Sequence, residues 1–183
     1  MGVGEVDRCI HAFFDENKQM NIVMLIKLIH ILSAFWFISG LLGRGLVLSK
    51  ASRTADIQTV TALVQLAGRF ERQMVIPGSM VVFLVGLLIA WMQGWPIFGF
   101  FQGGSSNWVL ASLVFYLSLV PVITWIFTPR GKVFDKALQA AQAQGKVTPE
   151  LTIAFGDKVV AAAHAYELLA VTVIIILMVT KPF

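Results

Sequence analysis

The order of apolar and polar residues divides the chain into four long apolar runs separated by polar segments. The runs cover residues 22–43, 74–93, 107–128 and 158–180. Each is long enough to cross about 30 Å of hydrocarbon as a helix that rises about 1.5 Å per residue. Backbone that faces lipid must satisfy its hydrogen bonds internally, so the runs are predicted to be helices rather than strands. The predicted fold is all-α: a transmembrane four-helix bundle that forms a single domain, 1–183.

Two of the polar segments between these runs carry a helical pattern of their own. In residues 55–73, apolar positions recur at helical spacing and the opposite face is polar. Such a helix either lies on the membrane surface or extends the second span. Residues 132–144 show a similar pattern after Thr128-Pro129-Arg130-Gly131, a stretch predicted to stop the third helix. We therefore expect amphipathic cytoplasmic helical segments in addition to the four spans.

Composition and charge support a membrane location and predict an orientation. The 183 residues are 57% hydrophobic and 13% charged, against about 45–50% and about 25% in soluble domains. Ten lysines and arginines lie between the first and second runs and between the third and fourth, counting Lys158 at the start of the fourth run, against Arg8, Lys18 and Lys181 in the other segments outside the runs. The positive-inside rule then places both termini outside a bacterial inner membrane. The pI of about 9.5 reflects this topology and a lipid bilayer partner, not nucleic acid.

The first apolar run carries a polar stripe that includes a histidine. At about 100° per residue, His30, Ser33, Gly40 and Arg44 share one face with Lys27. Small and polar residues on one stripe mark the face that packs against other helices. His30 is therefore predicted to face the bundle interior, either as a hydrogen-bonded core residue or as a ligand. Lys27 lies nearer the outer end and is predicted to reach the headgroups.

The fourth run repeats this arrangement with His164 and Glu167, one helical turn apart. A carboxylate at that depth must be neutral or paired. The ends of the first two spans supply Arg44, Glu71 and Arg72 as candidate partners. Two interpretations stay open: an ion-pair cluster that fixes helix register, or a site that handles a proton or a ligand.

Two intramembrane histidines raise the question of one haem held by both. His30 lies 14 residues from Arg44, about 21 Å along a helix, whereas His164 lies six residues from Lys158, about 9 Å. A difference of about 12 Å in depth is too large for two axial ligands of one iron. If iron binds, the two histidines are not predicted to share it.

The sequence contains no motif typical of a soluble enzyme. It has no phosphate-binding glycine loop, no HExxH, no CxxC and no nucleophile elbow. IPGSM, which includes Pro77 and Gly78, indicates a kink or a close helix contact. Whether the protein is an enzyme therefore stays open.

Three stretches resemble a large bacterial family of uncharacterised, predicted four-span integral membrane proteins. They are KLIHILSAFWFISGLLGRGLVL, IPGSM and the ending VIIILMVTKPF. The family is similar in turn to the membrane protoporphyrinogen IX oxidase and to copper-resistance protein D. The oxidase has a histidine early in its first span, a proline-methionine stretch in its second, a glutamate in its last and a Lys-Pro-Phe-like end. The corresponding residues here are His30, Pro77 with Met80, Glu167 and Lys181-Pro182-Phe183.

The resemblance implies association with haem b or a related redox ligand. His30 would be the metal ligand, with Arg44 placed to meet a propionate or a lipid phosphate. The oxidase carries a lysine in its third span where Ser112 stands here, so its activity is not expected. Two functions stay open: binding of haem or a redox ligand, or a small transporter or accessory subunit with a His/Glu/Arg cluster. Under either, a homo-oligomer or a redox partner is compatible with the sequence.

Overall fold

The computed structural model describes residues 3–103 and 107–182, which contain helices and no strand. Four stretches are long and apolar enough to cross a membrane: Asn21–Ala51, Ile57–Met92, Trp108–Gln144 and Pro149–Thr180. This confirms the prediction of an all-α fold with four apolar helices. The elements in chain order are α1 (Val3–Ala51), α2 (Ile57–Phe70), η1 (Glu71–Val75), α3 (Ile76–Met92), η2 (Gly99–Gln102), α4 (Trp108–Val122), η3 (Ile123–Phe127), α5 (Thr128–Gln144), α6 (Pro149–Phe155) and α7 (Lys158–Thr180).

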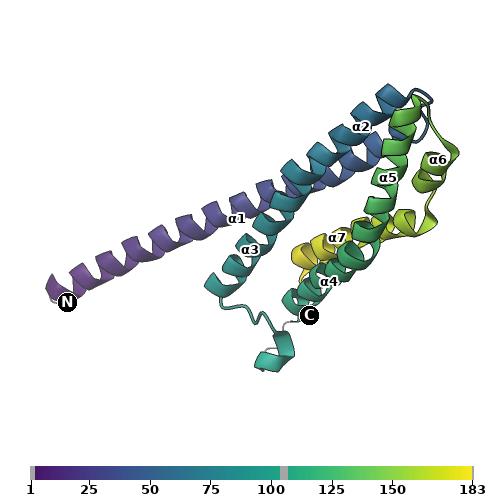
Figure 1. The fold of residues 1–183 in the computed structure, drawn as a ribbon. Helices are drawn as coiled ribbons and strands as arrows, with labels where there is room; N and C mark the ends of the chain where they lie inside the picture. The colour runs from purple at the N-terminus through teal and green to yellow at the C-terminus, as the bar shows by residue number, and fades with distance from the viewer. Residues whose placement is uncertain (1–2, 104–106, 183) are drawn as a thin grey trace.

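The helices pair into two hairpins (Figure 1). In the first hairpin, α1 packs along α2, η1 and α3; in the second, α4 packs along α7, and α5 packs on α6. The N-terminal part of α1 extends beyond the other helices (Figure 1). With 49 residues, α1 is about 74 Å long at about 1.5 Å per residue, more than twice the thickness of the hydrocarbon core.

Glycines allow α1 and α3 to approach each other closely. A Cβ atom added to Gly40 would lie 2.6 Å from Cβ of Met74, and one added to Gly78 would lie 3.0 Å from Cβ of Phe37. The structure thus has the close contact that the IPGSM stretch indicated. Because lipid is as apolar as the helix surfaces, association in a membrane relies on such close packing. The glycines therefore set the spacing of the first hairpin.

The second and third spans each contain one π-helical turn directly before an X-Pro pair. Residues 71–75 of η1 precede Ile76-Pro77, and residues 123–127 of η3 precede Thr128-Pro129. The N–H groups of Ile76 and Thr128 bond to carbonyls five residues back, on Glu71 and Ile123. A proline ring would clash with the carbonyl four residues back in a regular helix. The wider turn relieves that clash, so each helix bends and continues.

This continuity decides between the two arrangements expected for residues 55–73. Helix α2 runs through η1 into α3, so the amphipathic segment extends the second span. The stop predicted at residues 128–131 is wrong, because α5 continues from Thr128 to Gln144. Pro129 lies in the first turn after η3, where its missing N–H leaves no regular hydrogen bond unmade.

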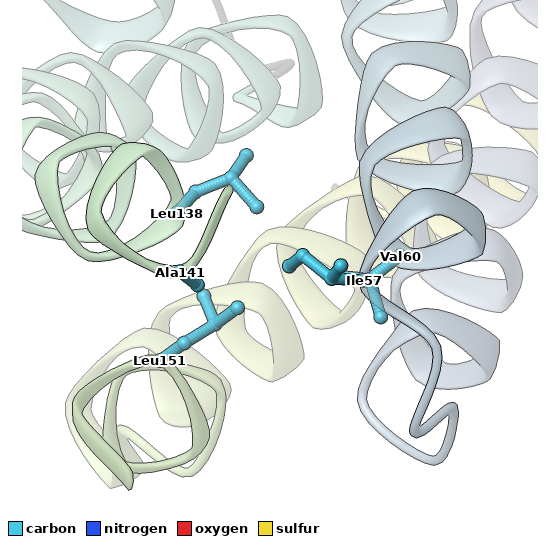
Figure 2. Close-up of a cluster of buried hydrophobic side chains, with 5 residues drawn as sticks. All are labelled: Ile57, Val60, Leu138, Ala141 and Leu151. Atoms are coloured by element: carbon cyan, nitrogen blue, oxygen red, sulfur yellow. The ribbon is translucent and has the colours of Figure 1, made fainter. Parts of the chain in front are cut away.

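The two hairpins meet at one end of the molecule, where an apolar cluster joins them. We call this end of the molecule the basic end, because residues 50–72 and 130–158 there carry most of the positive charge. Figure 2 shows α2 facing α5 and α6. The cluster consists of Ile57, Val60, Leu138, Ala141 and Leu151.

At the start of α2, the Asp56 carboxylate accepts hydrogen bonds from the hydroxyl and the N–H of Thr59, which hold the pKa of Asp56 below its ordinary value.

The glycine contact predicts opposite effects of one substitution at two positions of α1. Gly40→Ala should destabilise the protein by about 1–3 kcal/mol, the usual cost of overpacking, because its Cβ would overlap Met74. Gly45→Ala should be neutral or stabilising by up to about 1 kcal/mol, because a Cβ there meets no atom within 4 Å. Thermal unfolding of both variants in detergent checks this. Equal midpoints would show that α1 and η1 are not in close contact at Gly40.

Candidate functional site

A cavity of about 1320 Å³ lies between the two hairpins. It is larger than the about 300–1,000 Å³ of most small-molecule pockets. Along α1 its lining runs from Phe37 to Ser52, about 22 Å of helix at about 1.5 Å per residue. The cavity therefore extends from the basic end into the apolar part of the bundle. Its walls are mostly apolar and include the aromatic residues Phe37, Tyr116, Trp125, Phe127, Phe134 and Phe155.

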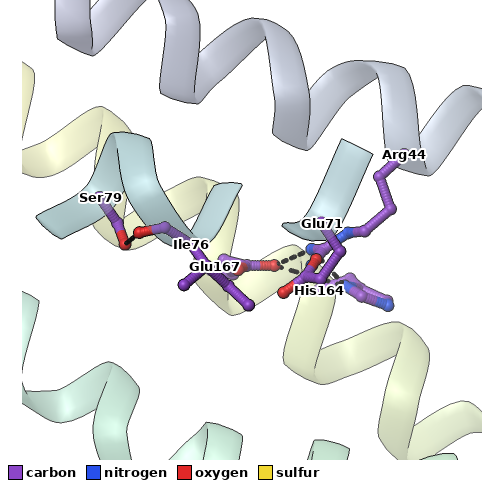
Figure 3. A network of polar contacts seen from close by, with 6 residues as sticks. All are labelled: Arg44, Glu71, Ile76, Ser79, His164 and Glu167. Atoms are coloured by element: carbon purple, nitrogen blue, oxygen red, sulfur yellow. Dashed lines mark hydrogen bonds and ion pairs between the residues drawn. The ribbon is translucent and has the colours of Figure 1, made fainter. Parts of the chain in front are cut away.

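Four polar side chains meet in the wall of this cavity, and we call them the Arg44 cluster: Arg44, Glu71, His164 and Glu167 (Figure 3). Arg44 Nη1 forms an ion pair with Glu71 Oε2, and Arg44 Nη2 forms one with Glu167 Oε2. His164 Nδ1 lies 3.2 Å from Arg44 Nη2 and 3.4 Å from Glu167 Oε2. The cluster joins α1, η1 and α7, and thus both hairpins.

The two contacts of His164 Nδ1 exclude each other. Arg44 only donates, so Nδ1 must be unprotonated to accept from it. Glu167 as a carboxylate only accepts, so Nδ1 must carry a proton to donate to it. One proton on Nδ1 therefore changes the partner of the ring from Arg44 to Glu167.

Two side chains of the cluster are largely buried, and the charges of the cluster do not balance. The side chains of Glu167 and Arg44 are 9% and 11% exposed, whereas those of His164 and Glu71 are 34% and 36% exposed. One arginine against two carboxylates leaves a net charge of −1 while His164 is neutral. An unbalanced charge away from water is costly. One added proton brings the net charge to zero.

Both π-helical turns contribute to this site. Glu71 is the first residue of η1, and Phe127 is the last residue of η3. The Phe127 ring packs against the His164 ring, with 4.6 Å between the ring centroids. Single π turns within α-helices are frequent at functional sites. The sequence analysis missed both turns and Phe127; the repeated signal was a proline inside a long apolar helix pattern, at Pro77 and Pro129.

Arg72 does not join the cluster. Its side chain is exposed, and no described residue forms an ion pair with it. Successive residues of a helix point about 100° apart, so only one of Glu71 and Arg72 can face Arg44. That residue is Glu71.

His30 lies apart from the cavity, in the contact between α1 and α3. Its ring packs on Gly86: a Cβ added there would lie 3.1 Å from His30 Cε1. His30 Nδ1 is buried and has no hydrogen-bond partner among the described residues. His30 precedes Arg44 by 14 residues on the same helix, about 21 Å. His164 contacts Arg44, so the two histidines lie at different depths, in agreement with the spacing argument.

This placement does not fit a haem held jointly by His30 and Arg44. The His30 ring faces a glycine of the neighbouring helix, and both terminal nitrogens of Arg44 are already paired. Among the side chains described, those of residues 21–103 and 107–182, no three His, Cys, Asp or Glu side chains are grouped to hold a metal ion. The residues that the resemblance implied for haem b therefore do not form one site.

Two further ionic residues line the cavity nearer the basic end. Arg130 of α5 pairs with Asp157. The other oxygen of Asp157 accepts the N–H of Val159 at 2.9 Å and caps α7. The Arg130 side chain is 41% exposed, so this pair is far more accessible than the pair between Arg44 and Glu167.

The difference in burial predicts unequal effects of removing each arginine. Arg44→Gln should destabilise the protein by about 3–5 kcal/mol, because it leaves the buried Glu167 carboxylate without a counter-charge. Arg130→Gln should cost about 0–1 kcal/mol, as for exposed ion pairs. Thermal unfolding in one detergent compares them. Adding Glu167→Gln to Arg44→Gln should recover part of the loss; no recovery would contradict the pairing.

The chain was compared with known proteins. The model of a family described as "predicted integral membrane protein (DUF2269)" matches residues 24–182, a range that contains all four members of the Arg44 cluster. No curated protein and no solved structure matches the chain. The match covers most of the chain, and the protein therefore belongs to the DUF2269 family of predicted integral membrane proteins.

Proposed function

We propose that the protein is a proton-coupled membrane transporter for a small amphipathic molecule. The Arg44 cluster takes up and releases the proton, and the cavity holds the molecule. The observation that carries this proposal is the pair of mutually exclusive contacts of His164 Nδ1. Histidine suits this role, because its ordinary pKa of about 6.5 lies within the physiological range.

Protonation of His164 changes the contact between the hairpins. The neutral ring, with its proton on Nε2, accepts a hydrogen bond from Arg44 at Nδ1, which keeps both attached to Glu167. A protonated ring donates to Glu167 and repels Arg44, because both then carry positive charge. The attraction between Arg44 and Glu167 is therefore weakened by a competing cation. Since this ion pair joins α1 to α7, proton uptake favours separation of the hairpins around the cavity.

The cavity favours transport over a purely structural cluster. An ion-pair cluster that only fixes helix register needs no large space beside it, whereas this one forms part of the wall of a cavity of about 1320 Å³. In the predicted topology, the basic end faces the cytoplasm. A molecule bound against the apolar walls would thus be reached from the cytoplasmic side or from lipid.

Haem binding through His30 is the rival hypothesis and has less support. The resemblance suggested it, and the buried, unpaired Nδ1 of His30 is compatible with it. However, the ring packs on Gly86 and does not line the cavity. A Soret band in the purified protein that His30→Ala abolishes would favour haem over transport.

The proposal predicts a proton-binding current that needs no knowledge of the transported molecule. Proteoliposomes on a solid-supported membrane are moved from about pH 8 to about pH 6, across the ordinary titration range of histidine. We expect a transient inward charge movement in the wild type and a loss of most of it in His164→Gln, which cannot take up the proton. Asp135→Asn, an exposed carboxylate of α5 outside the cavity lining, is the matched control and should keep the current.

Equal currents in the wild type and in His164→Gln would overturn the proposal. Empty liposomes define the background, and thermal unfolding of each variant shows that it is folded. If His164→Gln is poorly folded, Glu167→Gln in the same assay replaces it, since the proton on His164 then has no carboxylate to pair with.

A further inference from the structure

We infer that the cavity takes a lipophilic organic cation and that this cation and the proton compete for the same negative charge. The inference rests on the proposed function and names the chemical class of its ligand. It predicts exchange: binding of the cation releases the proton, and uptake of the proton releases the cation.

The charges that line the cavity favour a cation over an anion. Two arginines, Arg44 and Arg130, face three carboxylates, Glu71, Asp157 and Glu167. With His164 neutral, the lining has a net charge of −1. In a cavity with mostly apolar walls this excess charge is weakly screened. Either a proton or a cationic ligand neutralises it, whereas an anion would double it.

The cation is held by the carboxylate oxygens that Arg44 leaves unused. Arg44 uses Oε2 of Glu71 and Oε2 of Glu167. No described residue donates a hydrogen bond to Oε1 of either carboxylate. The Glu71 side chain is 36% exposed and that of Glu167 only 9%, so Glu71 is the carboxylate that a ligand reaches first.

Aromatic side chains that line the cavity supply further contacts for an organic cation. Organic cations bind to the faces of aromatic rings, and such aromatic sites recognise quaternary ammonium groups. Phe127 lies directly beside the cluster, with its ring packed at a tilt against the His164 ring. Tyr116, on the α4 wall, stacks its ring on Phe83 of α3 with 4.6 Å between centroids. Rings that are held in place lose little freedom when a ligand binds, which suits a bulky apolar cation.

A pair of probes of similar size and opposite charge tests the inference. Tetraphenylphosphonium and tetraphenylborate are measured by equilibrium dialysis against the full-length protein in nanodiscs, with empty nanodiscs as background. We expect saturable binding of tetraphenylphosphonium only. Glu71→Gln should weaken it about tenfold or more, because the cavity then has no net charge. Asp135→Asn should leave it unchanged.

Competition with protons is the second test, and it uses the wild-type protein alone. Tetraphenylphosphonium should bind more weakly at about pH 6 than at about pH 8, because a proton taken up by the Arg44 cluster neutralises the charge that the cation needs. It should also reduce the pH-jump current. The charged groups that face the cavity from the surrounding elements, and so act on this competition, are Arg44, Glu71, Arg130, Asp157 and Glu167.

Saturable binding of tetraphenylborate, or equal binding of tetraphenylphosphonium to the wild type and to Glu71→Gln, would overturn the inference. If tetraphenylphosphonium fails to bind while the proton current persists, only the ligand class is wrong. If the proton current is absent as well, the proposed function fails with it.

Discussion

A guanidinium group inside a membrane bundle must be paired, and the pairing of Arg44 organises this protein. Arg44 lies one turn beyond the glycine contact that holds α1 against α3, and its two terminal nitrogens reach carboxylates in different hairpins. Within the described part of the chain, its bond to Glu167 is the only ion pair that joins the hairpins. The apolar cluster at the basic end and hydrogen bonds from Tyr116 to the Ser79 carbonyl and from Gln142 to Thr61 also join the hairpins, so a change in the ion pair acts on the contact beside the cavity.

Proline chemistry brings the partners into place. The turns before Pro77 and Pro129 are widened, and residues of both widened turns line one cavity. One presents Glu71 to Arg44 and the other places Phe127 on His164. A feature usually regarded as a helix defect thus positions a carboxylate and an aromatic ring around one histidine.

The sequence predicted the elements better than their contacts. Apolar run length identifies four spans, and helical spacing places His164 and Glu167 on one face. The sequence does not show which of the adjacent residues Glu71 and Arg72 faces the cluster, because that depends on the rotation of the helix about its axis. It places His30 on the face that packs against other helices, as observed, but a stripe on one helix does not show that its neighbour is Gly86. Whether both termini lie outside stays a prediction from charge.

The account holds that the pair between Arg44 and Glu167 keeps the two hairpins together. The most direct test is the distance between spin labels on Leu42 of α1 and Leu169 of α7, two exposed positions, in a Cys9→Ser background. The account predicts one narrow distance distribution at about pH 8, and a longer or broader one when Glu167→Gln removes the charge. The same distribution in both proteins would show that the hairpins are held by other contacts and would contradict the account.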